Sequence, residues 1–210
     1  IGSDLVAKSK PDGYTLLAAG VPIAFNTALG RKLPYDAIKD FQSVTLTSIV
    51  PQVIVVNPIS PIKSIADLIA YAKANPGKVT FGSAGHGASN HLSGELLSAM
   101  GGFKMQHIPY KGAGPAIVDA MAGFVPLVTD NITSLKPHID AGKLRGIAVT
   151  GAKRNAAAPE IPTVSESGVP GFEVTTWYGF ALPAKTPRPI VDYFNAEIAK
   201  TLKAPDMRER

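Results

Sequence analysis

The segment Val79–Met100 constrains the fold of this chain most, because a strand, a small-residue loop and a helix follow one another without interruption. Residues 79–81 (VTF) are β-branched or aromatic, which favours an extended strand. Residues 82–89 (GSAGHGAS) form the loop, and apolar side chains then recur at helical spacing up to Met100. Two glycines, at 101 and 102, follow and end the helix.

A loop of this kind places the N-terminus of a helix at a potential binding site. The first backbone N–H groups of a helix have no partner within it, and the positive end of the helix dipole lies there. We therefore expect the amides of residues 85–89, with the hydroxyls of Ser83 and Ser89, to bind a carboxylate. The alternative is that the glycines only form a tight turn. The candidate residues in this loop are Ser83, Ala84, Gly85, Gly87, Ala88 and Ser89.

A further polar pair, Asp130-Asn131, directly follows an apolar strand-like segment. The carboxyl ends of strands in an α/β sheet lie at the edge where ligands bind. Asp130 could accept a hydrogen bond from a ligand amine or fix a water molecule, and the equal alternative is that it caps the next helix.

Strand-like and helix-like segments alternate along the chain, which favours an α/β fold with largely parallel sheets. Two long strand segments, near residues 50 and 175, can each pass from one lobe to another. The sequence thus predicts one lobe of residues 1–51 and 174–210 and a second lobe of residues 52–173. The predicted strands are 14–19, 41–57, 79–81, 104–109, 124–129, 144–149 and 172–182. The predicted helices include 26–33, 64–75, 134–141 and 187–203, with a last one opening at 205–210.

Composition excludes several classes of protein. The chain has no cysteine, so it has no disulfide, no thiolate metal site and no cysteine nucleophile. Its net charge of +5 is scattered rather than gathered in a stripe, which argues against a nucleic-acid partner. No apolar run approaches the roughly 18 residues of a membrane span.

Two kinds of chemistry need to be weighed against simple binding. A serine-dependent hydrolase would need Ser83 or Ser89 in contact with His86 or His91, and Asp119 or Asp130 to orient the imidazole. The loop lacks the G-x-S-x-G pattern of such enzymes, so we predict no catalytic residue.

A metal site would need ligands that converge. His86 and His91 are five residues apart, which places them on different faces of a helix, and His107 and His138 belong to other elements. The G-x-G-x-x-G and P-loop patterns of nucleotide sites are also missing. We predict no metal ligand and no cofactor.

Several motifs, in order along nearly the whole chain, resemble those of the Bug-type solute receptors of tripartite tricarboxylate transporters. They are Pro11–Leu16 (PDGYTL), Leu33–Asp36 (LPYD), Ser83–Leu92 (SAGHGASNHL), His107–Gly112 (HIPYKG), Asp130-Asn131, Gly142–Arg145 (GKLR), Ile161–Val164 (IPTV) and Trp177–Gly179 (WYG). The resemblance implies a two-lobed periplasmic-binding-protein (Venus-flytrap) fold whose lobes are joined by two crossing strands. It also implies a periplasmic protein without enzyme activity.

The resemblance further implies a ligand and partners. Such receptors capture a small carboxylate (a di- or tricarboxylate, an aromatic acid or an acidic amino acid) and deliver it to membrane transporter subunits. In the family two loops grip one carboxylate through amides, hydroxyls and waters, and one of those loops matches Ser83–Ser89. His86 stands where the family commonly has Asn. A ligand-sensing carrier that feeds a signalling partner is an alternative.

The second carboxylate loop of the family, rich in Pro and Gly, has no counterpart in this chain. The resemblance therefore implies a version that is incomplete at both ends. It also implies an uncovered apolar surface on the first lobe, through which the chain could form oligomers.

Overall fold

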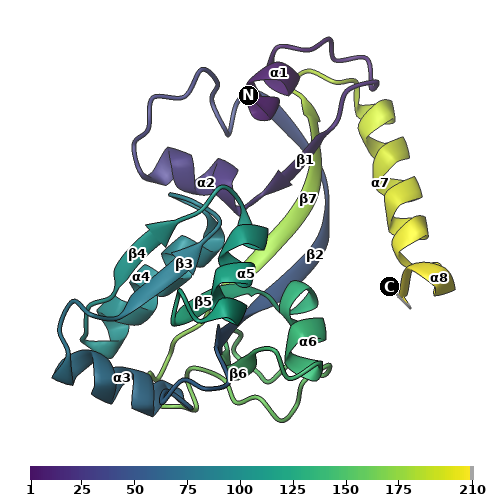
Figure 1. Ribbon diagram of the computed structural model, residues 1–210. Helices are drawn as coiled ribbons and strands as arrows, with labels where there is room; N and C mark the ends of the chain where they lie inside the picture. Colours follow the sequence, from purple (N-terminus) through teal and green to yellow (C-terminus); the bar gives the residue numbers. More distant parts are fainter. Residues whose placement is uncertain (209–210) are drawn as a thin grey trace. The chain divides into compact units, whose positions relative to one another are not determined.

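The computed structural model describes residues 1–208 and confirms an α/β fold (Figure 1). The chain divides into two compact units. Unit 1 contains residues 1–49 and the chain from 177 onward, and unit 2 contains residues 50–176. The chain enters unit 2 within strand β2 (Phe41–Val56) and leaves it within strand β7 (Thr175–Pro183).

Unit 2 contains a mixed sheet in which β2 pairs with β5 and β6, and β5, β3 and β4 follow in that order. The expectation of largely parallel sheets is wrong in part: β3 pairs in parallel with β4 and β5, whereas β2 is antiparallel to β5 and β6. Parallel pairs form where a helix links a strand to its neighbour, and β2 enters the unit without such a crossover to β5 or β6. The elements are α3 (Ile65–Ala74), β3 (Thr80–Ser83), α4 (Ser89–Gly101), β4 (Gln106–Pro109), α5 (Ala113–Ala122), β5 (Leu127–Asn131), α6 (Ile132–Asp140) and β6 (Arg145–Val149).

The core of unit 2 lies on both faces of this sheet. Ile54 and Val56 of β2 belong to one buried cluster, which includes Phe81 and side chains of α3 and α4. Val53 and Val55 belong to a second cluster with side chains of α5 and α6. Successive residues of a strand point to opposite faces, so the alternation along β2 supplies both clusters. The result is a sheet covered by helices on each side.

Helix α3 shows how closely local sequence sets an element of unit 2. Its N-cap, Ser64, accepts a hydrogen bond from the amide of Asp67 at 3.1 Å, as the sequence predicts. The predicted helix 64–75 is therefore confirmed, with an acidic residue in its first turn.

Unit 1 has smaller clusters of buried side chains. Strand β1 (Leu17–Gly20) pairs antiparallel with β7, and its buried residue, Leu17, packs with Val6 and Ala181. A groove of about 590 Å³ runs beside the two strands and is lined mainly by apolar side chains, among them Ile23, Phe41 and Phe180. The helices of unit 1 are α1 (Gly2–Ala7), α2 (Val21–Ala28), α7 (Arg188–Leu202) and α8 (Pro205–Arg208).

The predicted helix 26–33 is misplaced, because α2 begins at Val21. Pro22 lies in the first turn of α2, where a missing N–H has no cost, so this proline is compatible with a helix that begins before residue 26. The predicted helix 187–203 is confirmed as α7. Residues 209 and 210 of the last predicted helix lie outside the described residues. Within the described chain, no helix has both the length and the apolar character required to cross a membrane.

Candidate functional site

The predicted strand–loop–helix of residues 79–100 is present as β3, a five-residue loop and α4. Strand β3 lies between β4 and β5 and runs parallel to both. The carboxyl ends of the three strands therefore meet at one edge of the sheet, the position at which α/β proteins bind ligands. The loop after β3, the loop after β4 and the Asp130-Asn131 pair all lie at this edge.

The β3–α4 loop is braced by its own hydrogen bonds. Three of its amides donate to side chains and one donates to a backbone carbonyl. The pairs are Ala84 N to Asn90 Oδ1 (3.2 Å), Gly85 N to Ser83 Oγ (3.1 Å), Gly87 N to His91 Nδ1 (3.2 Å) and Ala88 N to Gly85 O (3.2 Å). Most of the amides that the sequence offered to an anion thus have partners within the segment of residues 83–91.

The first amides of α4 are different. The first backbone hydrogen bond of this helix runs from Leu92 N to Ala88 O at 3.1 Å, and His91 N donates to Asn90 Oδ1 at 3.1 Å. The amides of Ser89 and Asn90 precede these bonds, and in the described residues the helix offers them no acceptor. They are the donors that the positive end of the α4 dipole presents to a guest.

The two serines of the loop occupy different environments. Ser83 is fully buried, and its hydroxyl contacts His107 Nε2 at 2.6 Å and donates to Gly85 O at 3.2 Å. Ser89 is half-buried, and its hydroxyl oxygen accepts a hydrogen bond from Gln52 Nε2 at 3.0 Å. The proton of Ser89 therefore remains for an outside acceptor, whereas Ser83 holds the loop in shape.

Asp130 is half-buried at the end of β5, and its carboxylate accepts a hydrogen bond from the amide of Asn131 at 2.7 Å. Burial raises the pKa of Asp130, and the hydrogen bond opposes that shift only in part. Asn131, not Asp130, is the N-cap residue of α6. A partly desolvated carboxylate at this edge keeps the capacity to accept a proton or a donor group.

The structure supports the hydrolase alternative by one contact, between a serine and a histidine, but that serine is not accessible and neither candidate acid is free to orient the histidine. Ser83 and His107 lie within hydrogen-bond distance, although the sequence pointed to His86 or His91 as the base. However, Ser83 has no exposed surface for a substrate. Both candidate acids have other partners, because Asp119 accepts from the hydroxyl of Tyr110 at 2.7 Å and Asp130 accepts from Asn131 N. The geometry does not favour catalysis by this pair.

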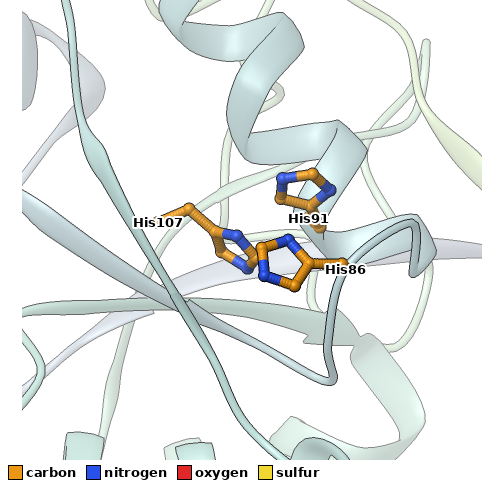
Figure 2. A group of neighbouring side chains, drawn as sticks. All are labelled: His86, His91 and His107. Carbon is orange, nitrogen blue, oxygen red and sulfur yellow. The ribbon is translucent and has the colours of Figure 1, made fainter.

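Three histidines converge at the loop, which the sequence did not predict (Figure 2). His86 comes from the loop, His91 from the first turn of α4, and His107 from β4. The ring centroids of His91 and His107 are 3.9 Å apart, and that of His86 is 5.0 Å from that of His107. The expectation that these residues stay apart is wrong, because the parallel β3–β4 pairing sets His107 opposite Phe81, beneath the loop. Burial, followed by the nearby His91 and His86, lowers the pKa of His107 to about 4.

The whole chain matches one protein family. A family model described as "Tripartite tricarboxylate transporter family receptor" matches residues 1–210. A protein from Pseudomonas sp. (strain P51), described as "UPF0065 protein in tcbD-tcbE intergenic region", is 42% identical over 210 residues, which are 100% of this chain and 62% of that protein.

Two solved structures are similar throughout. The structure "R. palustris Rpa4515 with adipate" has a TM-score of 0.90 and 35% identity, and the match covers 98% of this chain and 69% of that one. The structure of MatC from Rhodopseudomonas palustris with bound malate also has a TM-score of 0.90, with 30% identity and coverage of 99% and 71%. The chain thus spans about three fifths of the curated relative and about seven tenths of these structures.

Proposed function

Because the chain belongs to the receptor family of the tripartite tricarboxylate transporters, we propose that it is part of a periplasmic receptor that captures a small carboxylate. The receptor delivers this solute to membrane transporter subunits. Units 1 and 2 correspond in this proposal to the two lobes of a Venus-flytrap fold, within two or three residues of the lobe boundaries expected from the sequence at 51/52 and 173/174. The protein acts by binding and has no catalytic role.

The observation that carries the proposal is the N-terminus of α4. The amides of Ser89 and Asn90 and the hydroxyl proton of Ser89 are donors at the positive end of a 13-residue helix. A carboxylate has two oxygens, each with more than one lone pair, so it can accept from an amide and a hydroxyl at once. Hydrogen bonds to a charged acceptor are stronger than those between neutral groups.

The other candidate residues act mainly by shaping the loop. Gly87 has a φ of 77°, a left-handed conformation that suits glycine, and Gly85 has a φ of 131°. Ser83, Ala84 and Ala88 hold the loop through their hydrogen bonds. A loop that is already fixed before the ligand arrives loses little conformational entropy on binding. Asp130 would meet the part of the ligand that carries a donor group.

The similar structures support a dicarboxylate among the possible ligands. One of them holds adipate and the other holds malate, and both molecules carry two carboxylates. The loop described here would grip one carboxylate. We therefore propose dicarboxylates as the first ligands to test, before aromatic acids and acidic amino acids.

The test is the affinity of the full-length protein for adipate and malate, measured by calorimetry. We expect Ser89→Ala to weaken binding by about 0.5–1.5 kcal/mol, or roughly 2- to 13-fold, because one hydrogen bond to the carboxylate is lost. Ser134→Ala is the matched control, since Ser134 is an exposed serine near the start of another helix, α6.

Two results would count against the proposal. Unchanged affinity in Ser89→Ala would remove Ser89 from the binding site. Failure of the intact protein to bind any carboxylic acid in a thermal-shift screen would contradict the receptor function, because a bound ligand raises the melting temperature by mass action. Ester hydrolysis that disappears in Ser83→Ala would favour the hydrolase instead.

A further inference from the structure

We propose that His86, His91 and His107 form a binding site for one divalent transition-metal ion of the zinc class. One ring nitrogen from each histidine lies within 4.8 Å of the corresponding nitrogens of the other two. In a tetrahedral zinc site the metal–nitrogen distance is about 2.0–2.1 Å, which places the nitrogens about 3.3 Å apart. Rotations of the side chains by a small amount would close the site around an ion.

The three rings come from three different elements and differ in exposure. His91 lies in the first turn of α4 and His107 on β4, both half-buried, whereas His86 is an exposed residue of the loop. Figure 2 shows the three side chains grouped together, with the ring of His107 next to that of His86. Two ligands lie on regular elements, and the exposed side chain of His86 has room to change its rotamer toward the distance that a metal requires.

The partners of the rings suit a metal site. Because the Ser83 hydroxyl donates to Gly85 O, its oxygen can accept from Nε2 of His107, which leaves Nδ1 of that ring for a metal. Nε2 of His91 lies 3.8 Å from a carboxylate oxygen of Glu95, and Nδ1 contacts the Gly87 amide at 3.2 Å. Metal-bound histidines commonly donate their second ring N–H to an oxygen acceptor such as a carboxylate, which fixes the ring orientation. An ion at Nδ1 of His91 would take the place of the hydrogen bond from the Gly87 amide, which is one of the bonds that brace the loop.

The donor set indicates which metals would bind. Imidazole nitrogens suit zinc, copper, nickel and cobalt, while calcium and magnesium require oxygen ligands. A histidine binds metal through an unprotonated ring nitrogen, so the affinity of such a site depends on pH. Three protein ligands leave a fourth position for water or an anion. If the proposed function holds, a carboxylate seated at α4 would be near this position.

The decisive experiment is calorimetric titration of the untagged full-length protein with Zn²⁺, together with the visible absorption of bound Co²⁺. We expect one ion per chain and the intense Co²⁺ bands of a tetrahedral site. His86→Asn removes one ligand at an exposed position and should lower the Zn²⁺ affinity at least tenfold. The matched control is His138→Ala, which changes the fourth histidine of the chain, on α6 and outside the cluster, and should leave the affinity unchanged.

Two outcomes would overturn the metal site. The first is Zn²⁺ affinity in His86→Asn equal to that of the unmodified protein, and the second is an equal loss in His138→Ala. The metal titration is made without carboxylate, and the carboxylate titration is repeated after removal of metal with a chelator. If the protein binds carboxylate but not Zn²⁺, the metal-site proposal fails. If it binds Zn²⁺ but no carboxylate, the proposed receptor function fails.

Discussion

The loops after β3 and β4 look alike in sequence but differ in structure. Both contain glycine, both connect adjacent parallel strands to helices, and both lie at the same edge of unit 2. The β3–α4 loop is braced by the side chains of Asn90 and His91, the second and third residues of its helix. The corresponding residues of α5, Gly114 and Pro115, have no side-chain acceptor. The side chains in the first turn of the helix, rather than the glycines, thus determine whether hydrogen bonds fix the preceding loop before a ligand binds.

The largest expected effect concerns a glycine inside each helix. A Cβ atom on Gly94 of α4 would overlap with the ring of Phe81, which is fully buried, so a side chain in the core would have to shift. A Cβ on Gly114 of α5 meets no atom within 4 Å. Gly94→Ala should therefore lower the free energy of unfolding by about 1–3 kcal/mol through overpacking, measured by denaturant titration.

The control for this prediction is Gly114→Ala. It should be neutral or raise stability by up to about 1 kcal/mol, because alanine restricts the unfolded chain and favours the helix. Equal stability of the two variants would mean that α4 is no more tightly seated on the sheet than α5.

The second prediction compares the glycines of the two loops. Gly87 has a φ of 77° and Gly112 a φ of 106° with a ψ of 167°, and alanine in such positive-φ conformations is strained by about 1–3 kcal/mol. Both variants should melt at lower temperature. Only Gly87→Ala should also weaken carboxylate binding in calorimetry, because it distorts the braced loop. Equal affinities in the two variants would assign the ligand to a different part of unit 2.

The smallest effect concerns Tyr110, which directly follows β4 and donates to Asp119 of α5 at 2.7 Å. Burial, with the hydrogen bond and charge of Asp119, raises the pKa of Tyr110 to about 12. The protonated tyrosine is favoured by folding, so its contribution is complete below pH 10, the ordinary pKa, and is lost as the pH rises from about 10 to 12.

Tyr110→Phe should therefore destabilise the protein by about 1 kcal/mol near neutral pH, where Asp119 loses its donor. The difference from the unmodified protein should shrink between about pH 10 and pH 12. Unfolding curves at several alkaline pH values test this. A constant difference across that range would show that the contribution of Tyr110 to stability does not depend on its hydroxyl proton.

Local signals predicted much of the fold. The helix 64–75 with its serine cap, the helix 187–203 and the strand–loop–helix of 79–100 are present, because each depends on periodicity and capping within one segment. The antiparallel pairing of β2 and the convergence of the histidines were missed. Both depend on which strands become neighbours, and spacing along the chain carries no such information. His107 lies in a predicted strand, so a correct parallel pairing of that strand with 79–81 could have revealed the cluster.

The site was predicted less well than the fold. The segment that forms it was identified, but the roles of its two serines depend on burial, which the pattern Gly-Ser-Ala-Gly does not reveal. Ser83 lies in the last, inward-facing position of β3, whereas Ser89 opens the next helix. The binding assignments to these residues remain predictions.

Gln52 gives the loop a connection to both strands by which the chain enters and leaves unit 2. Its buried side chain donates to Ser89 Oγ at 3.0 Å and to Thr176 Oγ1 at 3.2 Å, and its backbone amide donates to Thr150 Oγ1 at 2.8 Å. The hydrogen bonding of the Gln52 side-chain amide therefore depends on the position of the Ser89 hydroxyl. If a bound ligand moved that hydroxyl away, Thr176 would remain as the only partner of the Gln52 side-chain amide. The change in hydrogen bonding would then involve β2, which carries Gln52, and β7, which carries Thr176. The NMR signal of the Gln52 side-chain amide would then report whether a ligand is bound at the N-terminus of α4.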